Sequence, residues 1–152
     1  MIYDALKISV GLCKHFEGFR AHPYLDPAGI PTIGYGSTYY FGGSRVTLED
    51  PPIAETIAEE LLMTTLGNIY MLGIFKASPN VIDNANRLAA LTDFAYNLGV
   101  HNYRTSTLRK RVDAEDWERS AIEIRRWKYG GGRILKGLVL RREAEAQLLL
   151  RG

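Results

Sequence analysis

The sequence lacks several features that would assign it to a large class of proteins. It holds one cysteine, Cys13, among 152 residues, so no disulfide can form within the chain. No apolar run approaches the length of about 18 residues that a membrane-spanning helix needs, so we expect no stable membrane insertion. The N-terminal segment, MIYDALKISVGLCKHFEGF, is not a signal peptide, because Asp4 stands where positive charge is required and Lys7 and Lys14 interrupt the apolar stretch. We therefore expect a protein that is made and folded in a cytoplasm.

Several common catalytic and binding patterns are also missing. His15, His22 and His101 have neither metal-ligand spacing nor an HExxH arrangement. There is no G-x-S-x-G nucleophile motif and no P-loop, and no helix that could hold a phosphate follows the glycines of GYGSTYYFGG. We therefore predict an activity that uses neither a metal ion nor a cofactor.

Charge is unevenly spread along the chain. Residues 1–80 carry 5 Lys and Arg against 8 Asp and Glu, whereas residues 81–152 carry 14 against 9. The basic second half suits an anionic partner such as nucleic acid, a membrane surface or a cell-wall polymer, and it equally suits an ordinary solvated helical surface. The hydrophobic share of 46% and the charged share of 24% are those of a globular protein, and the length fits one domain.

Residues 2–17 have the pattern of an amphipathic helix. On a helical wheel the apolar residues form one continuous arc, and the charged residues form the other. Gly18 provides a stop signal for this helix. Cys13 lies on the apolar face, which indicates a packed core thiol. Glu17 also falls inside the apolar arc, so we expect it to be partly buried, which favours its protonated form.

The pattern changes after this helix. Prolines and glycines separate the β-prone pieces AHPYL, PTIGYG and SRVTL, which predicts a small antiparallel sheet with DPAG as its first turn. Helical spacing follows in IAETIAEELLMTTLGNIYMLG, and NANRLAALTDFAYNLG is apolar nearly all the way round, as in a helix at the middle of a helical lobe. STLRKRV, the amphipathic AEDWERSAIEIRRWKY, a break at residues 130–132 and a helix over about residues 135–150 complete the chain.

The predicted fold class is α+β in a single domain. An N-terminal helix and a small antiparallel sheet form one lobe over about residues 1–50, and an all-helical lobe follows over about residues 51–152. A ligand would bind in the cleft between the lobes. Trp117 and Trp127 lie in helical apolar patterns, so we interpret them as core residues.

The segment HFEGFRAHPYLDPAGIPTIGYGS brings three candidate catalytic residues close together. Glu17 ends the first helix, Asp26 lies in the turn that enters the sheet, and Thr32 starts the next strand. Two carboxyl groups in unlike surroundings are what glycoside hydrolysis requires, because the one in apolar surroundings keeps its proton while the one in a polar turn stays ionised. The spacing by itself equally allows a helix-end acid, a turn acid and a strand threonine without a catalytic role.

This segment resembles the signature of the phage-type lysozymes, the endolysins of glycoside hydrolase family 24, with their Glu-eight-Asp-five-Thr triad. The resemblance continues through LAALTDFAYNLG, STLRKRV and RRWKYGGGRILKGLVLRREAE, and so spans most of the chain. It implies a helix, a hairpin and a helical second lobe. It also implies that Glu17 is the general acid, that Asp26 orients the attacking water or steadies developing positive charge, and that Thr32 is the third member.

The resemblance adds candidate substrate-binding residues. It implies that Arg141 or Arg142 approaches the catalytic glutamate. Ser37 follows the GYG motif where many members have histidine, so a role that rests on imidazole is not expected here. Tyr35 lies three residues beyond Thr32, where a regular strand would turn it to the opposite face, although the flanking glycines could bend the strand so that the ring meets a sugar.

The function implied by the resemblance is that of an endolysin. Such a protein hydrolyses the β-1,4 bond between N-acetylmuramic acid and N-acetylglucosamine in bacterial peptidoglycan and so lyses the host cell. We expect a monomer that binds peptidoglycan and not nucleic acid, and that stays in the host cytoplasm until a holin lets it reach the periplasm or cell wall.

Two alternative functions stay open. A lytic transglycosylase cleaves the same bond with one glutamate and no water, so it has less use for Asp26 and Thr32. A non-catalytic helical module that binds wall polymer or nucleic acid would leave Glu17 in the apolar arc unexplained.

Overall fold

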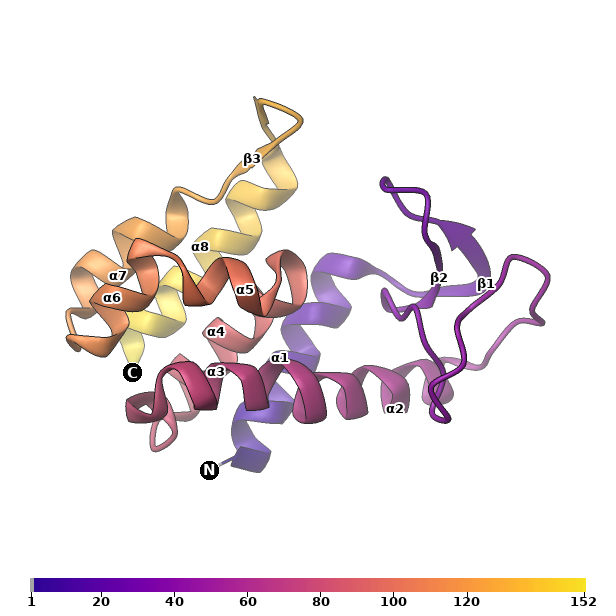
Figure 1. The fold of residues 1–152 in the computed structure, drawn as a ribbon, viewed down its shortest axis with the longest axis horizontal. Helices are drawn as coiled ribbons and strands as arrows, with labels where there is room; N and C mark the ends of the chain where they lie inside the picture. The colour runs from indigo at the N-terminus through magenta and orange to yellow at the C-terminus, as the bar shows by residue number, and fades with distance from the viewer. Residues whose placement is uncertain (1) are drawn as a thin grey trace.

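The structure, a computed structural model, describes residues 2–152 and confirms the predicted α+β class. The β1/β2 hairpin lies at one end of the molecule, and most helices gather at the other (Figure 1). In chain order the elements are α1 (Ile2–Glu17), β1 (Arg20–Leu25), β2 (Pro31–Gly34), α2 (Glu55–Thr65), η1 (Leu66–Met71), α3 (Leu72–Ala77), η2 (Pro79–Val81), α4 (Ala85–Leu98), α5 (Val100–Arg104), α6 (Thr107–Asp113), α7 (Trp117–Arg125), β3 (Tyr129–Gly130), β4 (Arg133–Ile134) and α8 (Lys136–Arg151). Within residues 2–152, no helix combines the length and apolar character needed to span a bilayer. The expected division between two lobes near residue 50 stays a prediction.

The sheet is smaller than the sequence predicts. β1 and β2 pair antiparallel, with Tyr24 opposite Thr32. The predicted third strand, SRVTL, is wrong, because residues 44–48 make no named strand and contribute only an isolated bridge to Tyr39. The side chain of Asp50 accepts hydrogen bonds from the backbone N–H and the hydroxyl group of Thr47 at 2.8 and 2.6 Å. These local bonds hold the segment in a turn where a strand would need ladder partners.

The segment that the sequence predicts as one helix is a continuous helical run over residues 55–77. It starts after the two prolines at positions 51 and 52 and extends from the hairpin end to the helical end of the molecule (Figure 1). A π-helical turn, η1, interrupts it at residues 66–71. Such turns are rare and occur often at functional sites.

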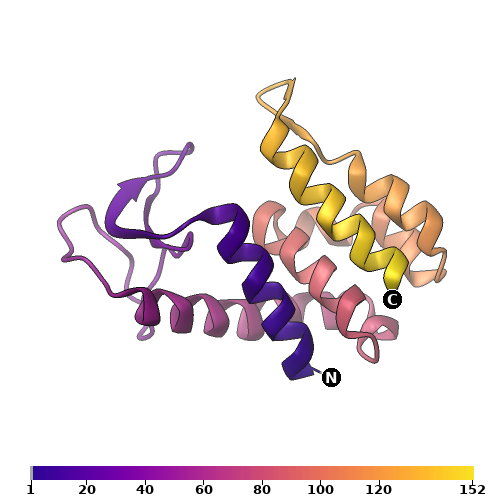
Figure 2. The ribbon, with the colours of Figure 1, turned by 180° about the vertical axis from the view of Figure 1, so that it is seen from behind.

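α4 is the centre of the helical end. Every residue from 88 to 95 is buried, as predicted for a helix that is apolar nearly all the way round. α1 and α8 pack against α4, and Figure 2 shows all three together from behind. Trp117 and Trp127 pack against the same core, which confirms their interpretation. The ring of Trp127 meets Phe94 edge-on at 5.4 Å between centroids.

The C-terminal third differs from the prediction in detail. α7 ends at Arg125, before the predicted end of AEDWERSAIEIRRWKY, and the glycine run is the turn of a short hairpin between β3 and β4. Tyr129 pairs with Ile134 across this turn. The final helix, α8, begins and ends within one residue of its predicted bounds.

Candidate active site

Glu17 is the last residue of α1, directly before the chain enters β1. Its side chain is 23% exposed, which confirms the partial burial predicted from the apolar arc. Its Oε2 atom accepts a hydrogen bond from Nη1 of Arg141 at 2.5 Å. The predicted preference of Glu17 for its protonated form stays a prediction.

The backbone of Gly36 closes over the other carboxyl oxygen of Glu17. A Cβ atom at position 36 would lie 3.2 Å from Oε1 of Glu17 and 3.0 Å from the hydroxyl oxygen of Tyr96. Gly36 also has a φ of +92°, a conformation that favours glycine. Only a residue without a side chain therefore lets this segment approach Glu17 so closely.

Arg141 is the arginine that reaches Glu17, which resolves the choice that the sequence left open. Its side chain is buried, and its Nε and Nη2 atoms donate to the two carboxylate oxygens of Asp93 at 2.9 and 2.8 Å. Bonding at two points fixes the plane of a guanidinium, so Nη1 is left for Glu17. Burial alone would lower the pKa of Arg141, but its hydrogen bonds and its attraction to Asp93 and Glu17 raise the pKa above its usual value.

Asp93 projects from α4 and is fully buried. It accepts a further hydrogen bond from the thiol of Cys13 at 3.1 Å. Burial by itself raises the pKa of Asp93, but hydrogen bonds with Glu145 and Arg141 hold the pKa below its usual value. Burial, and then the charge of Asp93, raise the pKa of Cys13, so the thiol is a neutral donor. The predicted core thiol is confirmed, since Cys13 is fully buried.

Arg142 has a different set of partners. Its Nε and Nη2 atoms donate to Glu145 at 2.6 and 2.8 Å, and Nη1 donates to the side chain of Asn97 at 2.9 Å. Burial, followed by the neighbouring Asp93, raises the pKa of Glu145 well above its usual value. The prediction of Arg142 as a substrate-binding residue is wrong, because its guanidinium is buried and engaged within the core.

Asp26 and Thr32 belong to the β1/β2 hairpin. The Oδ1 atom of Asp26 accepts hydrogen bonds from the backbone N–H groups of Ala28 and Ile30 at 2.8 and 2.9 Å, which fixes the predicted turn. No hydrogen bond reaches its Oδ2 atom from residues 2–152. Thr32 is almost fully buried, and its hydroxyl group donates to the carbonyl oxygen of Ile30 at 2.8 Å.

Tyr24 lies near both Glu17 and the two hairpin residues. It stands opposite Thr32 in the hairpin and two residues before Asp26. Burial, and next the negative charges of Glu17 and Asp26, raise the pKa of Tyr24, while Arg20 above its ring opposes them. Both carboxyl groups therefore lie within electrostatic reach of one phenol.

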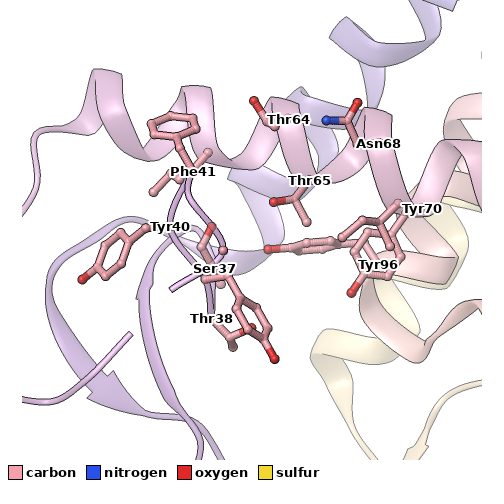
Figure 3. A pocket seen from close by; sticks show the side chains of 14 residues that line it. Ser37, Thr38, Tyr40, Phe41, Thr64, Thr65, Asn68, Tyr70 and Tyr96 are labelled. Atoms are coloured by element: carbon pink, nitrogen blue, oxygen red, sulfur yellow. The ribbon is translucent and has the colours of Figure 1, made fainter. Parts of the chain in front are cut away.

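A pocket of about 460 Å³ is lined in part by Gly36 and Tyr96, two residues near the Glu17 carboxyl group, although Glu17 itself does not line it. It lies between residues 36–43, the α2–η1 surface and Tyr96 of α4. Figure 3 shows Tyr70 and Tyr96 on one side and Ser37 and Thr38 on the other.

The family described as phage lysozyme matches residues 14–145. The chain belongs to the phage lysozyme family. A relative named SAR-endolysin, from Bacteriophage PS119, is 33% identical over 139 residues, which cover 90% of this chain and 77% of the relative.

Solved structures agree with this assignment. An endolysin from Escherichia coli O157:H7 phage FAHEc1 has a TM-score of 0.83 and 30% identity, covering 95% of this chain and 91% of that one. The muramidase domain of SpmX from Asticaccaulis excentricus has a TM-score of 0.70 and 28% identity, covering 93% and 94%.

Two other predicted residues differ in their surroundings in this phage lysozyme. The ring of Tyr35 is 3% exposed and its hydroxyl group donates to Glu55 at 2.7 Å, so its prediction as a sugar-stacking residue is wrong. β2 ends at Gly34, which has a φ of +67°, and the ring of Tyr35 packs in one cluster with Ala58 and Leu62 of α2. Ser37 lines the pocket, and its buried hydroxyl oxygen has no hydrogen-bond partner within residues 2–152. Ser37 therefore stays a candidate for contact with substrate.

Sequence reasoning missed Asp93 and Tyr96. A signal for Asp93 was present, since an acid inside a helix that is apolar on every side must have a buried partner. Tyr96 gave no such signal, because a tyrosine in an apolar helix fits a core position as well as a pocket wall. Its hydroxyl group donates to the carbonyl oxygen of Tyr35 at 2.8 Å and so ties α4 to the GYG segment.

Proposed function

We propose that this phage lysozyme is an endolysin that hydrolyses the β-1,4 bond between N-acetylmuramic acid and N-acetylglucosamine in bacterial peptidoglycan. The observation that carries the proposal is the setting of Glu17. Its partly buried carboxyl group bonds Arg141, which Asp93 holds in place, and it lies near two residues that line the pocket, Gly36 and Tyr96. Membership of the family and the endolysin relatives support the same activity.

In this proposal Glu17 gives its proton to the oxygen of the leaving sugar. A general acid must hold a proton before it can donate one, and a neighbouring arginine opposes that. Asp93 lessens the conflict, because its carboxylate bonds Nε and Nη2 of Arg141 and balances the guanidinium charge. Arg141 can then orient Glu17 while Asp93 balances its charge.

Asp26 and Thr32 supply the water side of the reaction in this proposal. The backbone holds Oδ1 of Asp26, so Oδ2 is available to accept a hydrogen bond from an attacking water. The hydroxyl group of Thr32 donates to a carbonyl, and its lone pairs can accept from the same water. Hydrolysis of this kind inverts the configuration at the anomeric carbon and needs a separation of about 6.5–9.5 Å between the two carboxyl groups.

The test combines one substitution with product analysis on purified peptidoglycan. Glu17→Gln keeps the shape of the side chain but has no acidic proton, so we expect a loss of about 10²–10⁴-fold in kcat. Glu59→Gln is the matched control. Glu59 is a partly exposed acid on α2 that pairs at 3.0 Å with Lys14, a residue of the helix that ends at Glu17. Mass analysis should find reducing-end muramic acid with water added.

Each alternative function has its own signature. Anhydro products, formed equally well by Asp26→Asn, would identify a lytic transglycosylase. Full activity of Glu17→Gln would contradict both enzymatic functions, and wall binding without any cleavage by the wild-type chain would indicate a binding module.

The cellular setting belongs to the same proposal. We infer that the protein acts as a monomer on the cell wall, and that it waits in the host cytoplasm for a holin to open a route to the periplasm or wall. Similarity to proteins named endolysin supports action on the wall. Holin dependence rests on the family resemblance alone.

A further inference from the structure

Tyr24 shares one face of the β1/β2 hairpin with Asp26 and Thr32. It pairs directly with Thr32 across the two strands, and cross-strand partners point to the same face of a sheet. The backbone N–H of Asp26 donates to the carbonyl oxygen of Ile30 at 3.0 Å, so the pairing continues one residue beyond β1. Because side chains alternate along an extended chain, Tyr24 and Asp26 point the same way, and Leu25 between them points the other way.

The exposure of these residues shows which way the shared face is turned. Leu25, on the opposite face, is 54% exposed. Thr32 is only 3% exposed, and Tyr24 and Asp26 are partly buried, so the shared face is turned toward the protein. Cβ atoms of direct cross-strand partners lie about 5 Å apart and those of diagonal neighbours about 7–8 Å apart, which an aromatic side chain can bridge. The hydroxyl group of Tyr24 can therefore approach the polar atoms of both other residues.

The ring of Tyr24 is held in place, whereas its hydroxyl group is free to bond a ligand. The guanidinium of Arg20 lies over the ring, 4.4 Å from its centroid. Nothing in the described part of the chain, residues 2–152, forms a hydrogen bond with the hydroxyl group. Burial, followed by the negative charge of Glu17, raises the pKa of Tyr24, so the phenol keeps its proton at neutral pH and can donate it in a hydrogen bond. Tyr24 is thus an unused donor within electrostatic reach of the catalytic acid.

The water in the proposed reaction has room for one further partner. Its two hydrogens are directed at Oδ2 of Asp26 and at the hydroxyl oxygen of Thr32, which are the acceptors left over in the hairpin. One lone pair of the water must face the anomeric carbon, and the other is then open. Ordered waters in proteins typically make about three hydrogen bonds. A donor on the same face of the hairpin would complete this set.

We propose that Tyr24 is a further catalytic residue, whose hydroxyl group donates a hydrogen bond to the attacking water. This inference rests on the proposed function, because it takes hydrolysis as the reaction. The bond orients the water so that its remaining lone pair faces the anomeric carbon. As the new C–O bond forms and the bond to the leaving oxygen breaks, the water gives a proton to Asp26, and Glu17 gives its proton to the leaving oxygen. Tyr24 keeps its own proton throughout.

The experiment compares Tyr24→Phe with the wild type on purified peptidoglycan. This substitution removes the hydroxyl group and leaves the ring in contact with Arg20. Tyr3→Phe is the matched control, because Tyr3 is an exposed tyrosine in the first turn of α1 with the amino group of Lys7 5.4 Å from its ring centroid. Initial rates of reducing-end release give kcat and KM, and thermal unfolding gives Tm.

We expect the kcat of Tyr24→Phe to fall about tenfold, as when one hydrogen bond to a reacting group is lost. Its KM should stay within about twofold of the wild-type value, because the hydroxyl group contacts the water and not the sugar. Its Tm should not change, and Tyr3→Phe should match the wild type in every measurement. An unchanged kcat would overturn the proposal. So would a fall in Tm that accompanies the loss of kcat, because Tyr24 would then act through the fold.

Binding measurements separate a contact with water from a contact with sugar. Glu17→Gln turns over glycan too slowly to consume it, so co-sedimentation with purified peptidoglycan measures its Kd. Adding Tyr24→Phe to this variant should leave Kd unchanged, and a weaker Kd would show that Tyr24 holds the sugar and overturn the proposal.

The failure of this inference can be distinguished from the failure of the proposed function. If the wild type hydrolyses peptidoglycan, Glu17→Gln does not, and Tyr24→Phe matches the wild type, only the role of Tyr24 is wrong. If the wild type releases anhydro products, no water attacks, and both the proposed hydrolysis and the role of Tyr24 are wrong.

Discussion

The contact between Asp93 and Arg141 yields a prediction about the whole site. Asp93→Asn keeps the size of the side chain and one oxygen acceptor, but it removes the negative charge that faces Nε and Nη2 of Arg141. Breaking a buried ion pair by removing one partner costs about 3–5 kcal/mol. Because asparagine can still accept one of the hydrogen bonds, we expect the free energy of unfolding to fall by about 2 kcal/mol.

The same substitution should change catalysis in a defined direction. With Asp93 neutral, Nε and Nη2 of Arg141 lose the carboxylate that fixes the plane of the guanidinium, so Arg141 orients Glu17 less firmly. We expect kcat to fall, with stability and activity both measured on the purified chain.

The pH dependence of stability provides a second, independent test of the role of Asp93. Hydrogen bonds in the folded state hold the pKa of Asp93 below its usual value, so its charged form stabilises the fold above the unfolded pKa. This contribution is lost as the pH falls from the unfolded value, about 3.9, through the lowered folded value. The difference in stability between wild type and Asp93→Asn should therefore be full at pH 7 and shrink below pH 4.

Glu143→Gln is the matched control for this prediction. Glu143 is a half-exposed acid on α8 that pairs with Arg125 at 2.8 Å, and its loss should cost no more than about 1 kcal/mol. The reasoning would be refuted if Asp93→Asn matched this control in urea unfolding and kept the kcat of the wild type. Arg141 would then be placed by the packing of α8 alone.

Two further substitutions test the surroundings of Glu17. Gly36→Ala places a Cβ atom near Glu17 and Tyr96 at a positive φ, so we expect a loss of about 1–2 kcal/mol in thermal unfolding and a larger loss in kcat; wild-type turnover would contradict the close approach. Cys13→Ser keeps a donor for Asp93, so activity should stay within about twofold while Tm falls by a few degrees. A folded but inactive serine variant would contradict the core-thiol assignment.

The sequence predicted those features that depend on local pattern. The end of α1 at Glu17, the turn at Asp26 and the buried helix α4 each follow from spacing within about 15 residues. The choice between Arg141 and Arg142 could not be made in this way. Adjacent residues on a helix point about 100° apart, and the rotation of α8 about its axis is set by its packing on α4.

The errors have physical causes of the same kind. The SRVTL segment has strand composition. The backbone N–H and the hydroxyl group of Thr47 within it donate to the side chain of Asp50, so these donors are bonded locally and the segment forms no named strand. Tyr35 was considered for the cleft because the flanking glycines could bend the strand. The ring packs against α2 instead, and its hydroxyl group donates a hydrogen bond to Glu55 of that helix.

The carboxyl group of Glu17 lies where the two ends of the molecule meet. From the hairpin end, the backbone of Gly36 lies against one of its oxygens, and from the helical end Arg141 bonds the other. Arg141 stands 124 positions away in the chain, and its own placement depends on Asp93 of α4. The acid is therefore oriented only when α8 has docked on α4 and the GYG segment has docked on α1. A substitution that loosens either contact should reduce catalysis before it unfolds the chain, because local opening needs less free energy than global unfolding.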